Sequence, residues 1–389
     1  MIRTGTMYRY FVVTICLVFL AGCWDHDEID DLALVMASGF DLTDDGQLEF
    51  SLQIALPTGI PTASQAGGKG QKPFLFVTAK GKTGYEIIGK LQTQLSRRIF
   101  FGLRGVIVFG ESFAKKGMNQ FLDPLIRFPD ARFSHVVTTY GITAKELLQS
   151  PYLLESIPAI GIRNILLSRS AIDIKIDEFL DGVAARDRSP ITAAVSLNAK
   201  DKENPTYLIN RAAVYRGNKL VGFLSPEETN LFRMWSKDVN ALSLYTQLER
   251  ENRDFKGLVT IGALDVKTKV QTKIKNQIPE ATIVYTIHAR IIENETELDM
   301  SKPEHLHRLE AKIARETEEK LNKMMTRLQK EFKSDIYGLG KEVHIQNPYY
   351  WKKVQDSWFA IYPEVPVTTK VEIKIEQMGR TRAPVHTKK

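Results

Sequence analysis

The chain has 389 residues, a formal charge of +7 and only two cysteines, Cys16 and Cys23. Its length favours two or three domains. It contains no dense run of lysine and arginine and no arginine–aromatic platform, which argues against nucleic acid as a partner.

Residues 1–22 are predicted to be a secretory signal. Arg3 and Arg9 form a positively charged start, and residues 11–20 form an apolar stretch of ten residues. As a helix this stretch would be roughly 15 Å long, about half of a ~30 Å hydrocarbon core, which is too short for a permanent span. No later apolar run approaches the length of a span, so we expect the rest of the chain to be soluble.

The residues Leu20-Ala21-Gly22-Cys23 resemble a bacterial lipobox, in which the thiol is diacylated and the chain is cut in front of it. This predicts cleavage between Gly22 and Cys23 and lipidation of Cys23. Each buried CH₂ contributes about 0.8 kcal/mol, so two acyl chains hold stably where one is marginal. The mature chain would keep a charge of +5 and no free thiol for a disulfide, a nucleophile or a zinc knuckle. The alternative is an ordinary export signal with an incidental cysteine.

An acidic tether and a hairpin are expected next. Residues 24–31 carry several carboxylates beside His26 but have no enforced geometry, so we expect a solvated tether rather than a metal site. Residues 32–56 form the predicted hairpin, with its turn at Asp44-Asp45-Gly46. Residues 48–54 alternate between apolar and polar side chains, which is typical of a half-buried strand.

Residues 57–73 are rich in Gly and Pro and are expected to form a flexible loop, with a binding loop as the alternative. Residues 74–150 then alternate between strand and helix patterns, which predicts an α/β unit. The expected strands are 74–79, 105–109 and 135–140, and the expected helices are 83–98, 112–128 and 143–149. Gly81-Lys82-Thr83 is not a phosphate-binding loop, because Phe76 occupies the position where that motif has glycine.

The main domain boundary is predicted at residues 201–205, a charged segment that ends in proline. It separates an N-terminal region, 23–204, from a C-terminal α+β domain, 205–389. Before the boundary we expect strands at 168–176 and 192–197 and a helix at 177–185.

The C-terminal domain is expected to hold hairpins and one long helix. The predicted strands are 207–215, 219–224, 257–265, 266–274, 281–292 and 365–377, and a helix capped by Ser225 follows the first two. Alternating lysines mark 266–274 as a solvent-facing edge strand. Residues 301–336 carry an apolar stripe behind a capping box formed by Ser301 and Glu304. The aromatic residues of 337–362 are expected to anchor the core, with a ligand cage as the alternative.

Several stretches together resemble the Ger(x)C family, the lipoprotein C subunits of spore germinant receptors. The stretches that carry the resemblance are Gly22-Cys23-Trp24-Asp25, Gly39-Phe40-Asp41, Gly81-Lys82-Thr83, residues 106–111, residues 335–340 and Tyr349-Tyr350-Trp351. They follow one another across nearly the whole mature chain. The resemblance implies an α+β fold of about three small mixed domains with largely antiparallel, twisted sheets.

The resemblance also implies a function. Such a protein is a lipid-anchored, non-catalytic subunit on the outer face of the spore inner membrane. Its partners would be an A subunit with membrane and soluble domains and a B subunit similar to an amino-acid permease. No catalytic, metal-binding or cofactor-binding residue is implied, and lipidation of Cys23 is the only residue-level chemistry that transfers.

Two other classes of exported protein remain as alternatives. An enzyme is disfavoured because the chain has no GxSxG or HExxH motif. A solute-binding lipoprotein of a transporter would need two α/β lobes around a cleft, whereas only residues 74–149 show that alternation.

Overall fold

The computed structural model describes residues 28–57, 72–118, 134–168, 171–198, 205–235, 242–248, 257–296 and 298–377, together with residues 9 and 121. The predicted cleavage site at Gly22 and the predicted lipidation site at Cys23 lie outside the described residues. Three other predicted segments lie wholly or mostly outside the described residues. They are the acidic tether, residues 58–71 of the Gly- and Pro-rich loop, and the second half of the helix expected over 112–128. No helix among the described residues is both long and apolar enough to span a bilayer.

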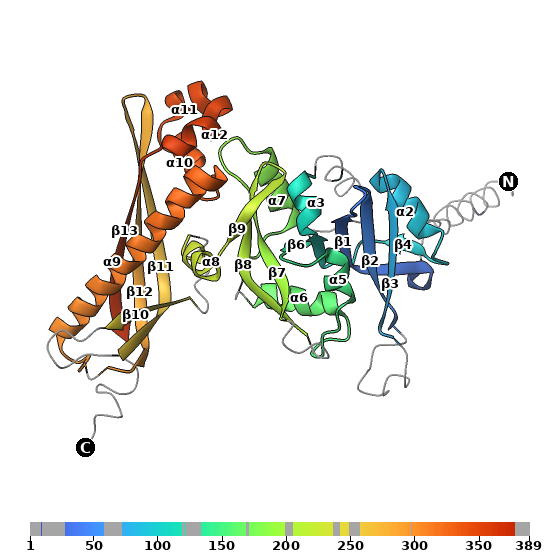
Figure 1. The fold of residues 1–389 in the computed structure, drawn as a ribbon, viewed down its shortest axis with the longest axis horizontal. Coiled ribbons are helices and arrows are strands. Elements are labelled where there is room, and N and C mark those ends of the chain that lie inside the picture. Colours follow the sequence, from blue (N-terminus) through green and yellow to red (C-terminus); the bar gives the residue numbers. More distant parts are fainter. Residues whose placement is uncertain are drawn as a thin grey trace, which may run out of the picture.

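The first half of the chain builds one mixed sheet, in the order β3-β2-β1-β5-β6-β7-β8-β9, with β4 paired to β1 (Figure 1). Strands β1, β5, β6 and β7 run parallel at its centre, and antiparallel hairpins lie at both sides. The bounds are β1 Leu32–Leu42, β2 Leu48–Ala55, β3 Phe74–Gly81, β4 Arg98–Phe100, β5 Val106–Phe109, β6 His135–Thr139, β7 Ile191–Asn198, β8 Thr206–Arg216 and β9 Lys219–Leu224.

Helices cover both faces of this sheet, as parallel strands require. The bounds are α2 Gly84–Gln92, α3 Glu111–Lys116, α5 Ala144–Gln149, α6 Pro158–Leu167 and α7 Ile176–Ala184, after a short 3₁₀ turn η1 at Ile29–Asp31. One apolar cluster joins the sheet to α2, α3 and α7, through side chains such as Ile87, Phe113 and Phe179. A second cluster joins the other face to α5 and α6, through Leu147 and Ile162.

The prediction that β2 is half-buried is wrong. Its polar residues Glu49, Ser51 and Gln53 are as buried as its apolar ones. Gln53 donates from Nε2 to the Leu148 carbonyl and accepts at Oε1 from the Ala159 amide, at 2.9 and 3.0 Å. The polar face of β2 therefore receives the end of α5 and the start of α6, because its side chains satisfy backbone groups there.

The second half builds a smaller sheet in the order β10-β11-β12-β13 (Figure 1). Its strands are β10 Ser243–Leu248, β11 Gly257–Lys275, β12 Ile278–Asn294 and β13 Val367–Gln377. Helix α9, Pro303–Arg327, packs its apolar stripe across one face and continues into a π-helical turn, η3 Leu328–Phe332. The remaining elements are α8 Pro226–Arg233, α10 Leu339–Gln346, α11 Pro348–Val354, η4 Gln355–Ser357, α12 Trp358–Ile361 and η5 Tyr362–Glu364.

The free edge of β13 is closed by α9 rather than by another strand. Glu318 accepts the Val371 amide at 2.8 Å, and Glu310 accepts the Ile375 amide at 2.7 Å. An open edge would invite pairing with another chain. These two carboxylates occupy two of the amide donors that such pairing would use.

Other sequence predictions need correction. Residues 171–176 form no strand beyond an isolated bridge at Lys175, and the helix expected over 83–98 ends at Gln92. The runs expected at 257–265 and 266–274 are one continuous strand, β11. The expected capping box is also wrong: the Ser301 hydroxyl donates to Asp299, and no side chain caps the helix start.

The mixed α+β class and the long helix of the second half are confirmed. The edge position expected for 266–274 is confirmed too, since β10 pairs only with the first part of β11. The hairpin of β8 and β9 extends the first sheet, so strand pairing continues past the boundary expected at 201–205. The second half is a sheet with one long helix, not the second α/β lobe of a solute-binding protein.

Candidate functional site at the joint between the two sheets

The segment that follows η3 turns the chain sharply from α9 into α10. Lys333 and Gly338 both have left-handed backbone, with φ of 50° and 65°. Glycine adopts this conformation without a steric penalty. The two turns bring residues 334–340 against the end of the first sheet, and 335–340 is one of the stretches that carry the family resemblance.

The carboxylate of Asp335 organises this segment. It is fully buried and accepts three hydrogen bonds: from the Leu339 amide at 2.9 Å, the Gly340 amide at 2.9 Å and Trp358 Nε1 at 3.0 Å. Burial raises the pKa of the Asp335 carboxyl to about 6, while the three donors act in the opposite direction. One side chain thus holds the start of α10 and the start of α12.

The same segment is joined to the first half of the chain by hydrogen bonds to main-chain carbonyls. The Ser189 amide donates to the Asp335 carbonyl at 2.8 Å, and the Ser334 hydroxyl donates to the Tyr215 carbonyl at 2.6 Å. A Cβ at Gly340 would lie 2.6 Å from the Asp187 carbonyl oxygen, so only glycine permits this approach. The apolar core of the second half also continues into β8, where it includes Val214. The joint is therefore packed and hydrogen-bonded.

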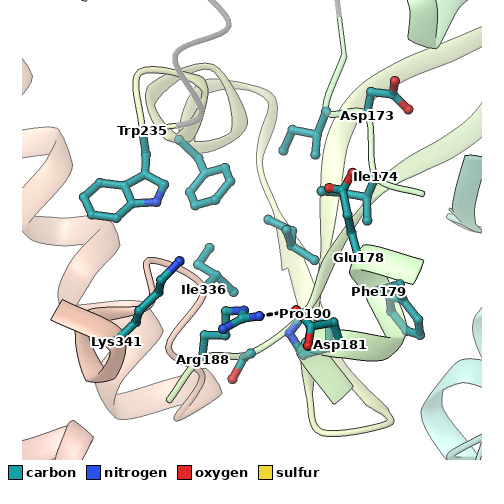
Figure 2. Close-up of a pocket in the computed structure, with 15 residues that line it drawn as sticks. Asp173, Ile174, Glu178, Phe179, Asp181, Arg188, Pro190, Trp235, Ile336 and Lys341 are labelled. Carbon is teal, nitrogen blue, oxygen red and sulfur yellow. Dashed lines mark hydrogen bonds and ion pairs between the residues drawn. The ribbon is translucent and has the colours of Figure 1, made fainter. Parts of the chain in front are cut away.

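A pocket of about 620 Å³ opens beside this joint (Figure 2). Its apolar lining includes Ile172, Ile174, Phe232, Trp235 and Ile336. Figure 2 shows Trp235 and Lys341 on one side and Asp173 and Glu178 on the other, with Arg188 between them. The pocket therefore places groups of opposite charge around an apolar wall.

Most charges in the pocket are already paired. Arg188 forms ion pairs with Asp181 and Asp187, the latter at 3.1 Å. Asp173 contacts His135 Nδ1 at 2.5 Å. Glu178 and Lys341 form no ion pair with another residue in the described part of the chain.

Two further lining groups are distinctive. Partial burial raises the pKa of Glu178, and the nearby Asp177 and Asp173 carboxylates add to this. The Ser189 hydroxyl oxygen is buried without a hydrogen-bond partner among the described residues. No base among the described residues is hydrogen-bonded to it, as the activation of a serine nucleophile requires.

The chemistry of this pocket suits recognition. A combination of apolar wall, paired charges and an unsatisfied hydroxyl can hold a small amphipathic group. Within the ranges that the structure describes, no group of three His, Cys, Asp or Glu side chains could hold a metal ion.

Sequence reasoning did not find this joint as a site. Residues 335–340 were singled out for the resemblance and as part of the aromatic-rich end of the chain, and Arg188, Ser189 and Trp235 were not singled out. A signal was present, since an aspartate within an apolar, glycine-containing run must find donors if it is buried. Neither the donors nor the pocket can be identified from spacing alone.

Two family profiles match the chain in succession. The profile described as spore germination protein N-terminal domain matches residues 25–197. The profile described as spore germination B3/GerAC like, C-terminal, matches residues 210–379. The two profiles meet near the hairpin of β8 and β9, which structurally extends the first sheet.

Curated relatives match over the same extent. The chain is 25% identical to spore germination protein KC of Bacillus subtilis (strain 168) over 395 residues, which covers 96% of each chain. It is 27% identical to spore germination protein B3 of the same organism over 384 residues, covering 96% of this chain and 98% of the relative.

A solved structure has the same fold. The crystal structure of the GerBC protein superposes with a TM-score of 0.58 at 21% identity, covering 87% of this chain and 96% of that one. The fold similarity spans both sheets, as do the two profiles. The chain therefore belongs to the GerAC-like family of spore germination proteins.

Proposed function

We propose that this protein is the lipid-anchored C subunit of a nutrient germinant receptor and acts without catalysis. The observation that carries this proposal is the match of both family profiles, in order, from residue 25 to residue 379. The relatives named above are spore germination proteins, and the match covers 96% and 98% of their lengths. Its partners would be the membrane subunits A and B of the receptor.

The membrane attachment in this proposal rests on the first 23 residues. The apolar stretch 11–20 is too short to span, and Cys23 follows two small residues, as in a lipobox. Two acyl chains would suffice for stable anchoring. The folded body would then lie at the outer face of the spore inner membrane.

A scaffolding role suits the geometry of the joint. Asp335 spends its hydrogen-bonding capacity on Leu339, Gly340 and Trp358. It fixes the starts of two helices, which is a structural use of a buried carboxylate. A rigid body of this kind can transmit or hold contacts between membrane subunits.

The test uses spores in which this subunit is replaced by the Cys23→Ala variant, with Cys16→Ala as the matched control. Both changes remove one thiol, but Cys16 would leave with the signal. We expect Cys23→Ala protein to leave the membrane fraction, and nutrient-triggered dipicolinate release to slow at least tenfold. Cys16→Ala spores should behave like wild type.

Two measurements make this test decisive. Immunoblots report whether each variant is present, and circular dichroism of the purified Cys23→Ala body reports whether it is folded. Wild-type release rates in Cys23→Ala spores, or in spores without this protein and its paralogues, would contradict the proposal.

A further inference from the structure

The tip of the β11–β12 hairpin is held rigidly against α10 and α11 (Figure 1). Asn276 and Gln277 both have positive φ, 49° and 63°, as a tight two-residue hairpin turn requires. The Gln346 side chain replaces a neighbouring strand: it accepts the Thr272 amide at 2.8 Å and donates to the Val270 carbonyl at 3.1 Å. The tip and these two helices therefore form one surface.

The first helix turn after α10 is tied to the tip as well. The Tyr350 hydroxyl donates to the Gln277 carbonyl at 2.7 Å, and Asn347 Nδ2 donates to the Thr272 hydroxyl at 2.9 Å. The side chains around these contacts are therefore presented in fixed positions. Binding to these side chains therefore costs little of their conformational entropy.

Large apolar side chains are exposed on this surface. The exposed fractions are 36% for Ile274, 41% for Ile278, 63% for Ile345 and 87% for Tyr349. None of the four belongs to the apolar clusters that the described residues form on the two sheets. We call these four residues the tip patch. Ile274 and Ile278 lie on opposite faces of the hairpin end, because Ile274 pairs with Pro279 and Lys275 pairs with Ile278. Each face of the end therefore exposes an isoleucine, and an end that is apolar on both faces suits insertion into a membrane interface.

Several lysines lie within four residues of a member of the tip patch in the sequence, as do the carboxylates of Glu280 and Glu342. Lys273, Lys275, Lys352 and Lys353 are all exposed. Lys275 lies 3.5 Å from Glu280, the one acidic partner recorded for these lysines in the described ranges. Isoleucine and tyrosine beside a set of lysines suit the boundary between lipid tails and anionic headgroups.

We propose that the tip patch contacts the surface of an anionic phospholipid bilayer. The apolar side chains would enter the interface while the lysine ammonium groups pair with lipid phosphates. Each lysine near such a surface contributes about 1 kcal/mol, so a set of four makes a reversible contact. The contact needs no acyl chain, and it goes beyond the receptor role because it orients the body on the membrane.

The test is vesicle co-sedimentation of the chain from residue 23 with Cys23→Ala, which retains every element from η1 to β13. We expect binding to mixed phosphatidylglycerol–phosphatidylcholine vesicles that weakens with added salt, and little binding to phosphatidylcholine alone. The variants Lys352→Glu with Lys353→Glu, and Ile278→Ser with Tyr349→Ser, should each lower the affinity at least tenfold.

Matched controls separate the patch from net charge and general apolarity. Lys302→Glu with Lys374→Glu makes the same charge change away from the tip, toward the opposite end of the sheet. Leu153→Ser with Leu154→Ser removes leucines that are 76% and 82% exposed in the first half. Both controls should bind vesicles within about twofold of the parent.

Three results would overturn the proposal. The first is absence of binding to anionic vesicles, and the second is an equal loss in the charge control, which would show attraction by net charge alone. The third is a concentration-dependent dimer that Tyr349→Ser abolishes, which would make the tip patch a contact between copies of this chain. None of these results bears on the receptor role, whose test is germination.

Discussion

Replacement of Asp335 by alanine is expected to lower the free energy of unfolding by about 3–5 kcal/mol. The change removes the acceptor for the Leu339 and Gly340 amides and for the Trp358 indole, all within a fully buried site. Unsatisfied buried donors are costly because they lose water without gaining a partner. Urea unfolding monitored by tryptophan fluorescence measures the difference.

The same joint offers a matched control. Asp356 pairs with Arg186 at 2.5 Å, but its side chain is 78% exposed. Exposed ion pairs contribute little, so Asp356→Ala should cost less than about 0.5 kcal/mol. Equal effects of the two substitutions would contradict the importance assigned to the Asp335 carboxylate. The loss of unfolding free energy in Asp335→Asn should lie between the losses in Asp356→Ala and Asp335→Ala. The amide oxygen of asparagine can still accept a hydrogen bond, but its nitrogen cannot accept from the indole or amide donors.

The pKa of Asp335 gives this joint a distinct pH dependence. Burial raises the pKa from 3.8 to about 6. A carboxyl whose pKa is higher in the folded state stabilises the fold when protonated. Its contribution is present below about pH 4 and is lost as the pH rises through about 6. As the pH rises from about 4 to about 6, the unfolding free energy of wild type should therefore fall by about 3 kcal/mol relative to that of Asp335→Asn.

Asp41 is expected to be the second sensitive carboxylate. Asp41 lies near the end of β1, and its carboxylate accepts hydrogen bonds from the Ala144 and Lys145 amides, each at 2.8 Å, at the start of α5. It is 2% exposed, and burial raises its pKa although the two amides act in the opposite direction. Asp41→Ala should cost about 2–3 kcal/mol, because both helix amides lose their acceptor.

A double-mutant cycle with Gly110 tests this geometry. A Cβ at Gly110 would lie 2.0 Å from the Asp41 Oδ1 atom, so Gly110→Ala must displace that carboxylate. Gly110→Ala and Asp41→Ala should therefore each destabilise the fold, and the double variant should lose less than the sum. Strict additivity in urea unfolding would show that the two residues do not act on one another.

Local patterns were enough to predict many elements. The hairpin of β1 and β2, the capped helix after Ser225 and the apolar stripe of α9 follow from periodicity and turn residues, which act within a few positions. Burial of Gln53 could not be predicted, because its partners Leu148 and Ala159 lie 95 and 106 positions away. Residues 172–176 alternate between isoleucine and charged side chains, which is a strand pattern, but they pair only in an isolated bridge at Lys175 because alternation alone does not supply a partner strand.

The joint was predictable only in part. The stretch 335–340 was visible as a family feature. Its function as a joint depends on Ser334 reaching Tyr215, 119 positions earlier, and on Ser189 reaching Asp335. The tip patch was missed for the same reason: the hairpin end and α11 are brought together by contacts such as that of Tyr350 with Gln277, 73 positions earlier.

We propose above all that acyl chains on Cys23 hold the folded body at the membrane. Mass spectrometry of the protein purified from spore inner membrane tests it most directly. We expect an N-terminal peptide that begins at Cys23 and carries a diacylglyceryl group. A peptide in which Gly22 still precedes an unmodified Cys23 would contradict it.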